Sequence, residues 1–97
     1  MARRVKSGDP EIYCDFNAWL TERGLLPVRG TVEDLAALGL TLEEAVGHRF
    51  VFRQWDHRAD GTPDALMWNG LVIRDPKLGI LLEGDEDGYY HRSDVEG

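Results

Sequence analysis

The sequence contains little cysteine, no long hydrophobic run and fewer basic than acidic residues. Its 97 residues include one cysteine, Cys14, which excludes an intrachain disulfide and a cysteine-based zinc site. No segment approaches the roughly 18 apolar residues that a membrane-spanning helix needs. The basic start, Met1 to Lys6, is followed by Ser7-Gly8-Asp9-Pro10 and not by the apolar segment of a signal peptide. We therefore expect a cytoplasmic protein without membrane contact.

The charged residues are mostly acidic. Lys and Arg together number 11 against 18 Asp and Glu, so the net charge is −7. Nonspecific binding to nucleic acid depends on clustered Lys and Arg, so we do not expect direct binding of that kind. Residues 7–47 hold eight acidic and two basic residues, and residues 83–97 hold six acidic residues and one Arg. The acidity is therefore concentrated at these two ends, while residues 48–82 are nearly balanced.

Length and patterning predict one domain, residues 1–97, of the α+β class. We expect a basic N-terminal arm (residues 1–8), a helical half (9–47) and an antiparallel β half (48–97). In this arrangement one long and two short helices pack on a sheet of four to five strands. The alternative form of the β half is a small barrel similar to an SH3-like barrel, a resemblance of fold alone that does not indicate function.

The long helix is predicted from Pro10 to Arg23. Asp9-Pro10-Glu11 has the residues of a helix start, and Gly24 suits a helix end. The face expected to be buried consists of Ile12, Tyr13, Phe16, Trp19 and Leu20. On this interpretation Trp19→Ala costs a few kcal/mol, as large core truncations do.

Two short helices follow in the prediction. Thr31-Val32-Glu33-Asp34 resembles a capping box, and Gly39 ends the helix that it opens. Thr41-Leu42-Glu43-Glu44 is a better box, and Gly47 limits its helix to a turn or two.

Strands are predicted at residues 49–55, 79–83 and 89–93. Asn69-Gly70 lies between the apolar runs 65–68 and 71–74, which is the sequence pattern of a tight hairpin. A single long strand bulged at Gly70 is the alternative.

Sequence patterns give weak candidates for chemistry. Residues 83–88, with Glu83, Asp85, Asp87 and Gly88, partly fit a calcium-loop template that ends at Asp94, but a hairpin turn explains them better. The polar loop 56–64 fits that template poorly. His57 and His91, with His48 elsewhere and Arg53 or Arg92, form an acid–base set for a small ribonuclease only if they meet in space. Ser93 as a nucleophile and Cys14 as a reactive thiol have little support. We therefore predict no catalytic residue, no metal and no cofactor.

The best functional indication is a set of aromatic residues in the β half. Trp55, Trp68, Tyr89 and Tyr90 lie there, and an exposed Trp or Tyr beside Arg is typical of an interaction hot spot. Together with the acidity, this favours a small non-catalytic inhibitor or accessory protein that engages a basic, nucleic-acid-processing protein, as antitoxins, immunity proteins and phage-encoded blockers do. The predicted partner contacts are Glu33, Asp34, Glu43, Glu44, Asp85, Glu86, Asp87, Trp55 and Tyr90. A small-barrel binder of peptide or single-stranded nucleic acid, and a small ribonuclease, are the alternatives.

Overall fold

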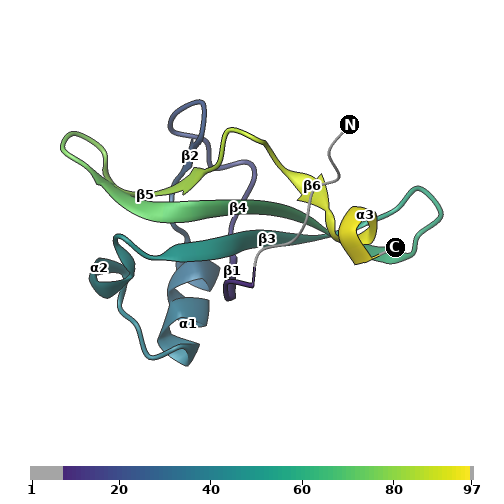
Figure 1. Ribbon diagram of the computed structural model, residues 1–97, viewed down its shortest axis with the longest axis horizontal. Coiled ribbons are helices and arrows are strands. Elements are labelled where there is room, and N and C mark those ends of the chain that lie inside the picture. The colour runs from purple at the N-terminus through teal and green to yellow at the C-terminus, as the bar shows by residue number, and fades with distance from the viewer. Residues whose placement is uncertain (1–7, 97) are drawn as a thin grey trace.

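The computed structural model describes residues 8–96, and it is built around one six-stranded sheet (Figure 1). The strand order is β1-β3-β4-β5-β2. Strand β6 pairs with β4 on the same edge as β5, at Leu66 and Met67, before the part of β4 that pairs with β5. The elements are β1 (Glu11–Tyr13), β2 (Gly24–Leu25), α1 (Arg29–Ala37), α2 (Leu42–Ala45), β3 (Arg49–His57), β4 (Pro63–Asp75), β5 (Gly79–Gly84), β6 (Tyr90–His91) and α3 (Arg92–Glu96). The predicted basic arm lies outside the described residues, apart from Gly8.

The predicted architecture, an N-terminal helical half packed on a C-terminal antiparallel sheet or SH3-like barrel, is wrong. Residues 10–23 form no helix: β1 pairs in parallel with β3, and β2 pairs with β5 at the opposite end of the sheet. Ile12 and Cys14 are both fully buried, which is the two-residue period of a strand. The same apolar residues also fit a helical face, and pairing with β3 decides between the two periods. Trp19, predicted for the core, is 42% exposed.

Strand β4 is continuous through Asn69-Gly70, so the hairpin prediction is wrong. The alternative of a single long strand is confirmed, but the bulge expected at Gly70 is not, because the pairing register is unbroken there. Gly70 pairs with Phe50 on one side and with Gly84 on the other. A Cβ atom at Gly70 would lie 2.2 Å from the carbonyl oxygen of Glu83 and 2.5 Å from the ring of Phe52. Glycine is required there for close packing within the sheet and not for a turn.

The two short helices form where they were predicted, with one shift. Helix α1 begins at Arg29, so Thr31 is inside it, where its hydroxyl donates to the carbonyl of Tyr13 at 2.8 Å. Helix α2 has the predicted capping box: the Thr41 hydroxyl accepts from the amide of Glu44 at 3.1 Å, and the Glu44 carboxylate accepts from the amide of Thr41 at 3.0 Å.

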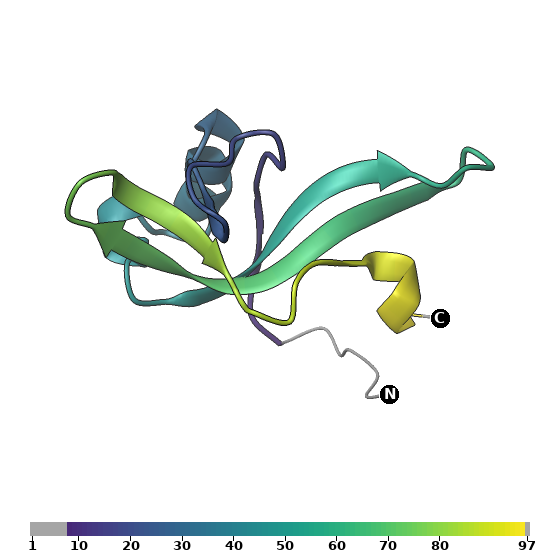
Figure 2. The ribbon, with the colours of Figure 1, turned by 90° about the horizontal axis from the view of Figure 1, so that it is seen from above.

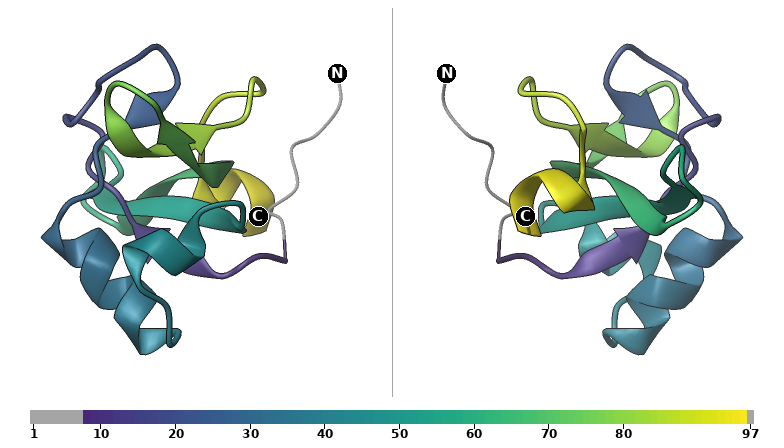
Figure 3. Two further views of the ribbon diagram at one scale, coloured as in Figure 1. Left: turned by 90° about the vertical axis from the view of Figure 1, so that its left-hand side faces the viewer. Right: turned by 90° about the vertical axis from the view of Figure 1, so that its right-hand side faces the viewer.

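Helices α1 and α2 cover one face of the sheet, and α3 closes part of the other (Figures 2 and 3). The larger core lies under α1 and α2 and includes Leu35, Ala45, Phe50, Phe52 and Trp68. The smaller core, under α3, consists of Val51, Ala65, Met67 and Tyr90 with Val95 against them. The far end of the β3–β4 hairpin extends beyond the three helices, as Figure 2 shows.

Candidate functional site

Four aromatic side chains form a cluster that reaches the protein surface, which we call the aromatic surface: Phe16, Trp19, Trp68 and Tyr89. Their ring centroids lie 5.4 to 6.2 Å apart in five contacting pairs. Trp68 is buried at the base, while Trp19 is 42% and Tyr89 52% exposed. Such centroid separations are those of favourable aromatic pairs, so the rings hold one another in place.

The chain reaches this arrangement by leaving the sheet after Cys14. The amide of Cys14 donates to the carbonyl of Arg53, and the amide of Phe16 then donates to the side-chain oxygen of Gln54 at 2.8 Å. Asp15 turns the chain by accepting from the amide of Asn17. Trp68 projects from β4, and its indole N–H donates to the carbonyl of Asp85 at 2.9 Å. The aromatic surface therefore joins three segments that are distant in sequence.

Four carboxylates lie close in sequence to the residues of the aromatic surface. Asp15 adjoins Phe16 in the chain, Glu22 follows Trp19, and Glu86 and Asp87 precede Tyr89. Arg23 is the basic residue in these two segments, and it lies 3.7 Å from Glu86. We call these four acidic residues the acidic rim, and they give the segments that carry the exposed aromatic residues a net negative charge.

A surface pocket of about 200 Å³ adjoins Phe16, and we call it the Asp56 pocket. It is lined by Phe16, Asn17, Gln54, Trp55, Asp56 and Leu66. Asp56 is its charged side chain, and no ion pair to Asp56 occurs among residues 8–96. The pocket therefore has a mixed lining, in which Phe16 and Leu66 are apolar and Asn17 and Gln54 are polar, and it holds a carboxylate that no described cation neutralises.

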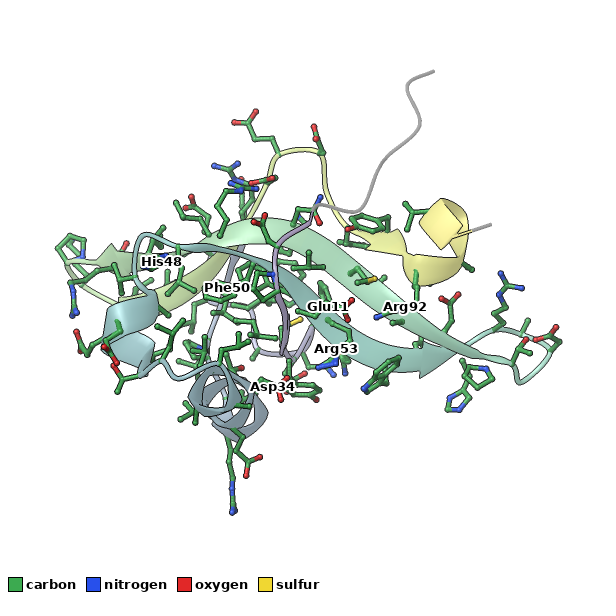
Figure 4. All side chains as sticks on the ribbon, turned by 60° about the horizontal axis from the view of Figure 1, so that its bottom comes forward. Glu11, Asp34, His48, Phe50, Arg53 and Arg92 are labelled. Atoms are coloured by element: carbon green, nitrogen blue, oxygen red, sulfur yellow. The ribbon has the colours of Figure 1, made fainter. Side chains whose placement is uncertain are left out.

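A second cluster, on the opposite face, ties the fold together (Figure 4). Arg53 donates to Asp34 at 2.9 Å and lies 3.8 Å from Glu11, which also accepts from Arg92 at 2.5 Å. Both guanidinium groups lie over the ring of Trp55, at 4.9 and 5.4 Å from its centroid. The two arginines are thus held by carboxylates and are not a phosphate clamp, and Trp55, although 60% exposed, packs against them.

The predicted histidine set does not assemble. His48 precedes β3 and His57 ends it, so about 30 Å of strand separates them. His91 lies on β6, and β4 runs between it and β3. His91 is in line with Gln54 across β4, so two strand spacings and three residues along β3 separate His57 from His91, on the order of 14 Å. The geometry does not support the ribonuclease alternative.

The predicted partner contacts are dispersed over the molecule. Among the acidic ones, Glu33 pairs with Arg29, Asp34 with Arg53, Glu43 with Arg74 and Asp85 with Arg49, while Glu44 caps α2 and Glu86 and Asp87 belong to the acidic rim. Tyr90 is only 5% exposed and its hydroxyl donates to Asn69, so Tyr89 is the outward-facing tyrosine. Phe16 and Trp19 were assigned to the core; the polar Thr21-Glu22-Arg23 beside them is the signal that could have placed them at the surface.

The two acidic loops that were compared with a calcium-loop template do not bring a set of metal ligands together. Among residues 8–96, no three His, Cys, Asp or Glu side chains gather as metal ligands. Segment 85–88 is a turn in which the amide of Gly88 donates to the carbonyl of Asp85, and Gly88 has a positive φ of 81°. The turn geometry thus accounts for this acidic, glycine-containing sequence.

Two buried groups, the Asp64 carboxylate and the Cys14 thiol, have shifted pKa values, and both have structural roles. Burial alone would raise the pKa of Asp64, yet hydrogen bonds from the Ala65 amide and from the amide and hydroxyl of Ser93 outweigh it and lower the pKa to about 2. This carboxylate therefore anchors α3 and is too weak a base to activate Ser93. Burial raises the pKa of the Cys14 thiol to about 12, against the opposing effect of nearby Arg53, so the thiol is unreactive.

A larger pocket, of about 390 Å³, lies at the other end of the sheet. Leu38, Leu40 and Phe50 form its apolar walls, with His48 and Arg49 beside them. Asp9 also lines this pocket, and Arg49 is paired with Asp85 at 2.5 Å and lies 3.9 Å from Asp9, so the charges of the lining are already matched within the chain.

Within the described residues, no helix is both long and apolar enough to span a bilayer. No known protein family, curated protein or solved structure matches the chain significantly.

Proposed function

We propose that this chain is a small non-catalytic binding module that engages a basic protein partner through the aromatic surface and the acidic rim. The observation that carries the proposal is the exposure of Trp19 and Tyr89 against the buried ring of Trp68, in segments that also carry four carboxylates. Aromatic residues are enriched at the centres of protein interfaces, and they carry much of the binding energy there.

The acidic rim favours a basic protein over a nucleic acid. Single-stranded nucleic acid stacks on aromatic side chains only where a positive groove also follows its backbone. Arg23 is the basic residue in the two segments that border the aromatic surface, and it faces Glu86. Phosphates would be repelled there, whereas Lys and Arg of a partner would be attracted and steered toward the site.

An inhibitor or accessory protein, comparable with antitoxins, immunity proteins or phage-encoded blockers, is the role that we propose for such a module. Its compartment is proposed to be the cytoplasm, where a buried thiol such as Cys14 stays reduced. The acidic contacts expected on α1 and α2 become secondary, since Asp34 and Glu43 are paired with arginines of the same chain.

Photo-crosslinking tests the proposal. A benzoylphenylalanine at position 19 is compared with one at position 78, because Leu78 is 46% exposed, close to the 42% of Trp19, and lies in the distant β4–β5 turn. In the cell that encodes the protein, position 19 should capture one basic protein that position 78 does not, and raised salt should weaken that capture. Equal capture at both positions, or capture of RNA or DNA at position 19, would contradict the proposal.

A further inference from the structure

The outer edge of β3 lacks a pairing strand beyond Arg53 within the described part of the chain. The register of β1 on β3 ends at Tyr13 opposite Arg53. The amide of Val51 and the carbonyl of Arg53 point toward the β1 side, because they bond to Pro10 and Cys14. Backbone groups alternate sides along a strand, so those of Trp55 and His57 point the same way. Pro63, which has no N–H, lies opposite His57. This position of Pro63 agrees with the orientation of His57, because the backbone groups of His57 point away from β4 and form no hydrogen bonds with it.

Two donors and two acceptors therefore lie along this edge. None of them bonds to another described residue. The chain segment that could have continued β1 turns away at Asp15–Asn17, held by the Asp15 turn and by Gln54. In Figure 2 this part of the β3–β4 hairpin extends past the rest of the sheet. An extended peptide can add to such an edge as a further strand.

The Asp56 pocket lies against the same edge. Gln54 and Asp56 share the face of the sheet that carries Phe16 and Leu66, whereas Trp55 projects to the opposite face against Arg53 and Arg92. A side chain of an added strand that points to the first face would enter this pocket. The side chains of Phe16 and Leu66 can pack against the aliphatic stem of Lys or Arg, and the Asp56 carboxylate and the amide oxygens of Asn17 and Gln54 suit its cationic end.

We propose that an extended segment of the basic partner pairs with β3 at Trp55 and His57 and places a Lys or Arg side chain in the Asp56 pocket. This inference rests on the proposed function and deepens it, since the pocket adjoins the aromatic surface at Phe16. The backbone edge supplies affinity for any extended segment, and Asp56 supplies selectivity for a cation. The side chains on either side of this Lys or Arg in the bound segment would point to the opposite face of the sheet, toward Trp55.

A display library of random ten-residue peptides, selected against the full chain, tests the proposal. Selected peptides should carry Lys or Arg at one fixed position, flanked by residues of high β propensity. In nuclear magnetic resonance spectra, the best peptide should protect the amides of Trp55 and His57 from hydrogen exchange. Selection of acidic peptides, or protection confined to other strands, would overturn the proposal.

Matched variants separate the two elements of the site. His57→Pro removes an outward N–H without touching the ladder to β4 and should weaken the selected peptide about tenfold, whereas His57→Ala should leave affinity unchanged. Asp56→Asn should weaken it about fivefold and abolish the preference for the cationic residue. Equal affinity of the Pro and Ala variants would refute strand addition. A concentration-dependent dimer that His57→Pro dissolves would also refute it, because a second copy would then occupy the edge.

The two proposals fail differently. If Trp19→Ser abolishes binding of the crosslinked partner while His57→Pro and Asp56→Asn do not, the aromatic surface is the binding site and the edge is not. If none of the three weakens the partner, both proposals are wrong.

Discussion

Gly84→Ala is the substitution that most directly probes how the aromatic surface is supported. Gly84 is buried at the end of β5, under the indole of Trp68. A Cβ atom there would lie 1.8, 2.0 and 2.3 Å from three atoms of that ring. Ordinary contact begins near 3.4 Å, so the indole must move by about 1.6 Å. Such a shift breaks the hydrogen bond from the Trp68 indole to the carbonyl of Asp85 and disturbs the contacts with Phe16, Trp19 and Tyr89.

The expected cost follows from these two losses. Overpacking a core costs roughly 1–3 kcal/mol, and a lost hydrogen bond costs about 1 kcal/mol more. The free energy of unfolding should therefore fall by about 2–4 kcal/mol, a large part of the roughly 5–15 kcal/mol that domains possess. At about 4–8 °C per kcal/mol, the melting temperature should fall by on the order of 10–30 °C.

Urea and thermal denaturation, followed by near-ultraviolet circular dichroism of the tryptophans, measure the effect. Gly8→Ala is the matched control, because nothing lies within 4 Å of the added methyl group. Its midpoint should match that of the wild type. A Gly84→Ala protein with unchanged midpoint and unchanged aromatic dichroism would refute this account of how Trp68 is seated.

Three further predictions concern other sites. Because folding lowers the pKa of Asp64 to about 2, the stability that it contributes is present above the unfolded value near pH 4 and is lost as the pH falls toward 2; α3 amide signals should report this loss, and Asp64→Asn should remove that pH dependence. Cys14 in the folded protein should not react with iodoacetamide at pH 8, whereas an exposed Ala59→Cys thiol should; rapid labelling of Cys14 without unfolding would contradict its burial. Asp34→Asn should lower the free energy of unfolding in urea by about 1–2 kcal/mol, since Arg53 loses a charge partner, while Glu33→Gln should change it by less than about 0.5 kcal/mol.

Local signals in the sequence predicted the local structure well. The capping box at Thr41, the glycine stop at Gly39 and the alternation in β3 each depend on neighbours within one turn or one strand. The turn at Asp75 is equally local, since its carboxylate accepts from the amides of Lys77 and Leu78.

Long-range pairing decided the parts that were wrong. Residues 10–16 fit two periods, and only the presence of β3 as a partner selects the strand. Asn69-Gly70 is a turn sequence that instead lies flat between β3 and β5, because Gly70 is needed where Phe52 and Glu83 approach.

The candidate site was partly foreseeable. Exposed aromatics beside Arg and a separate set of acidic contacts were predicted. Of the named contacts, Glu86 and Asp87 precede Tyr89, whereas Trp55 packs against Arg53 and Arg92, away from the aromatic surface. Sequence alone could not choose Tyr89 over Tyr90, because the short strand β6 and the pairing of Met67 with Tyr90 set which tyrosine faces inward.

The central claim is that the aromatic surface binds the partner, and one affinity comparison tests it. Isothermal titration calorimetry measures the Kd of the crosslinked partner for the wild type, Trp19→Ser and Leu78→Ser, with folding of each variant checked by circular dichroism. The two side chains are almost equally exposed, at 42% and 46%, so general loss of apolar area is matched. The partner should bind Trp19→Ser about 30-fold more weakly than wild type, and its Kd for Leu78→Ser should stay within about twofold of wild type. Equal dissociation constants for the two variants would contradict the claim.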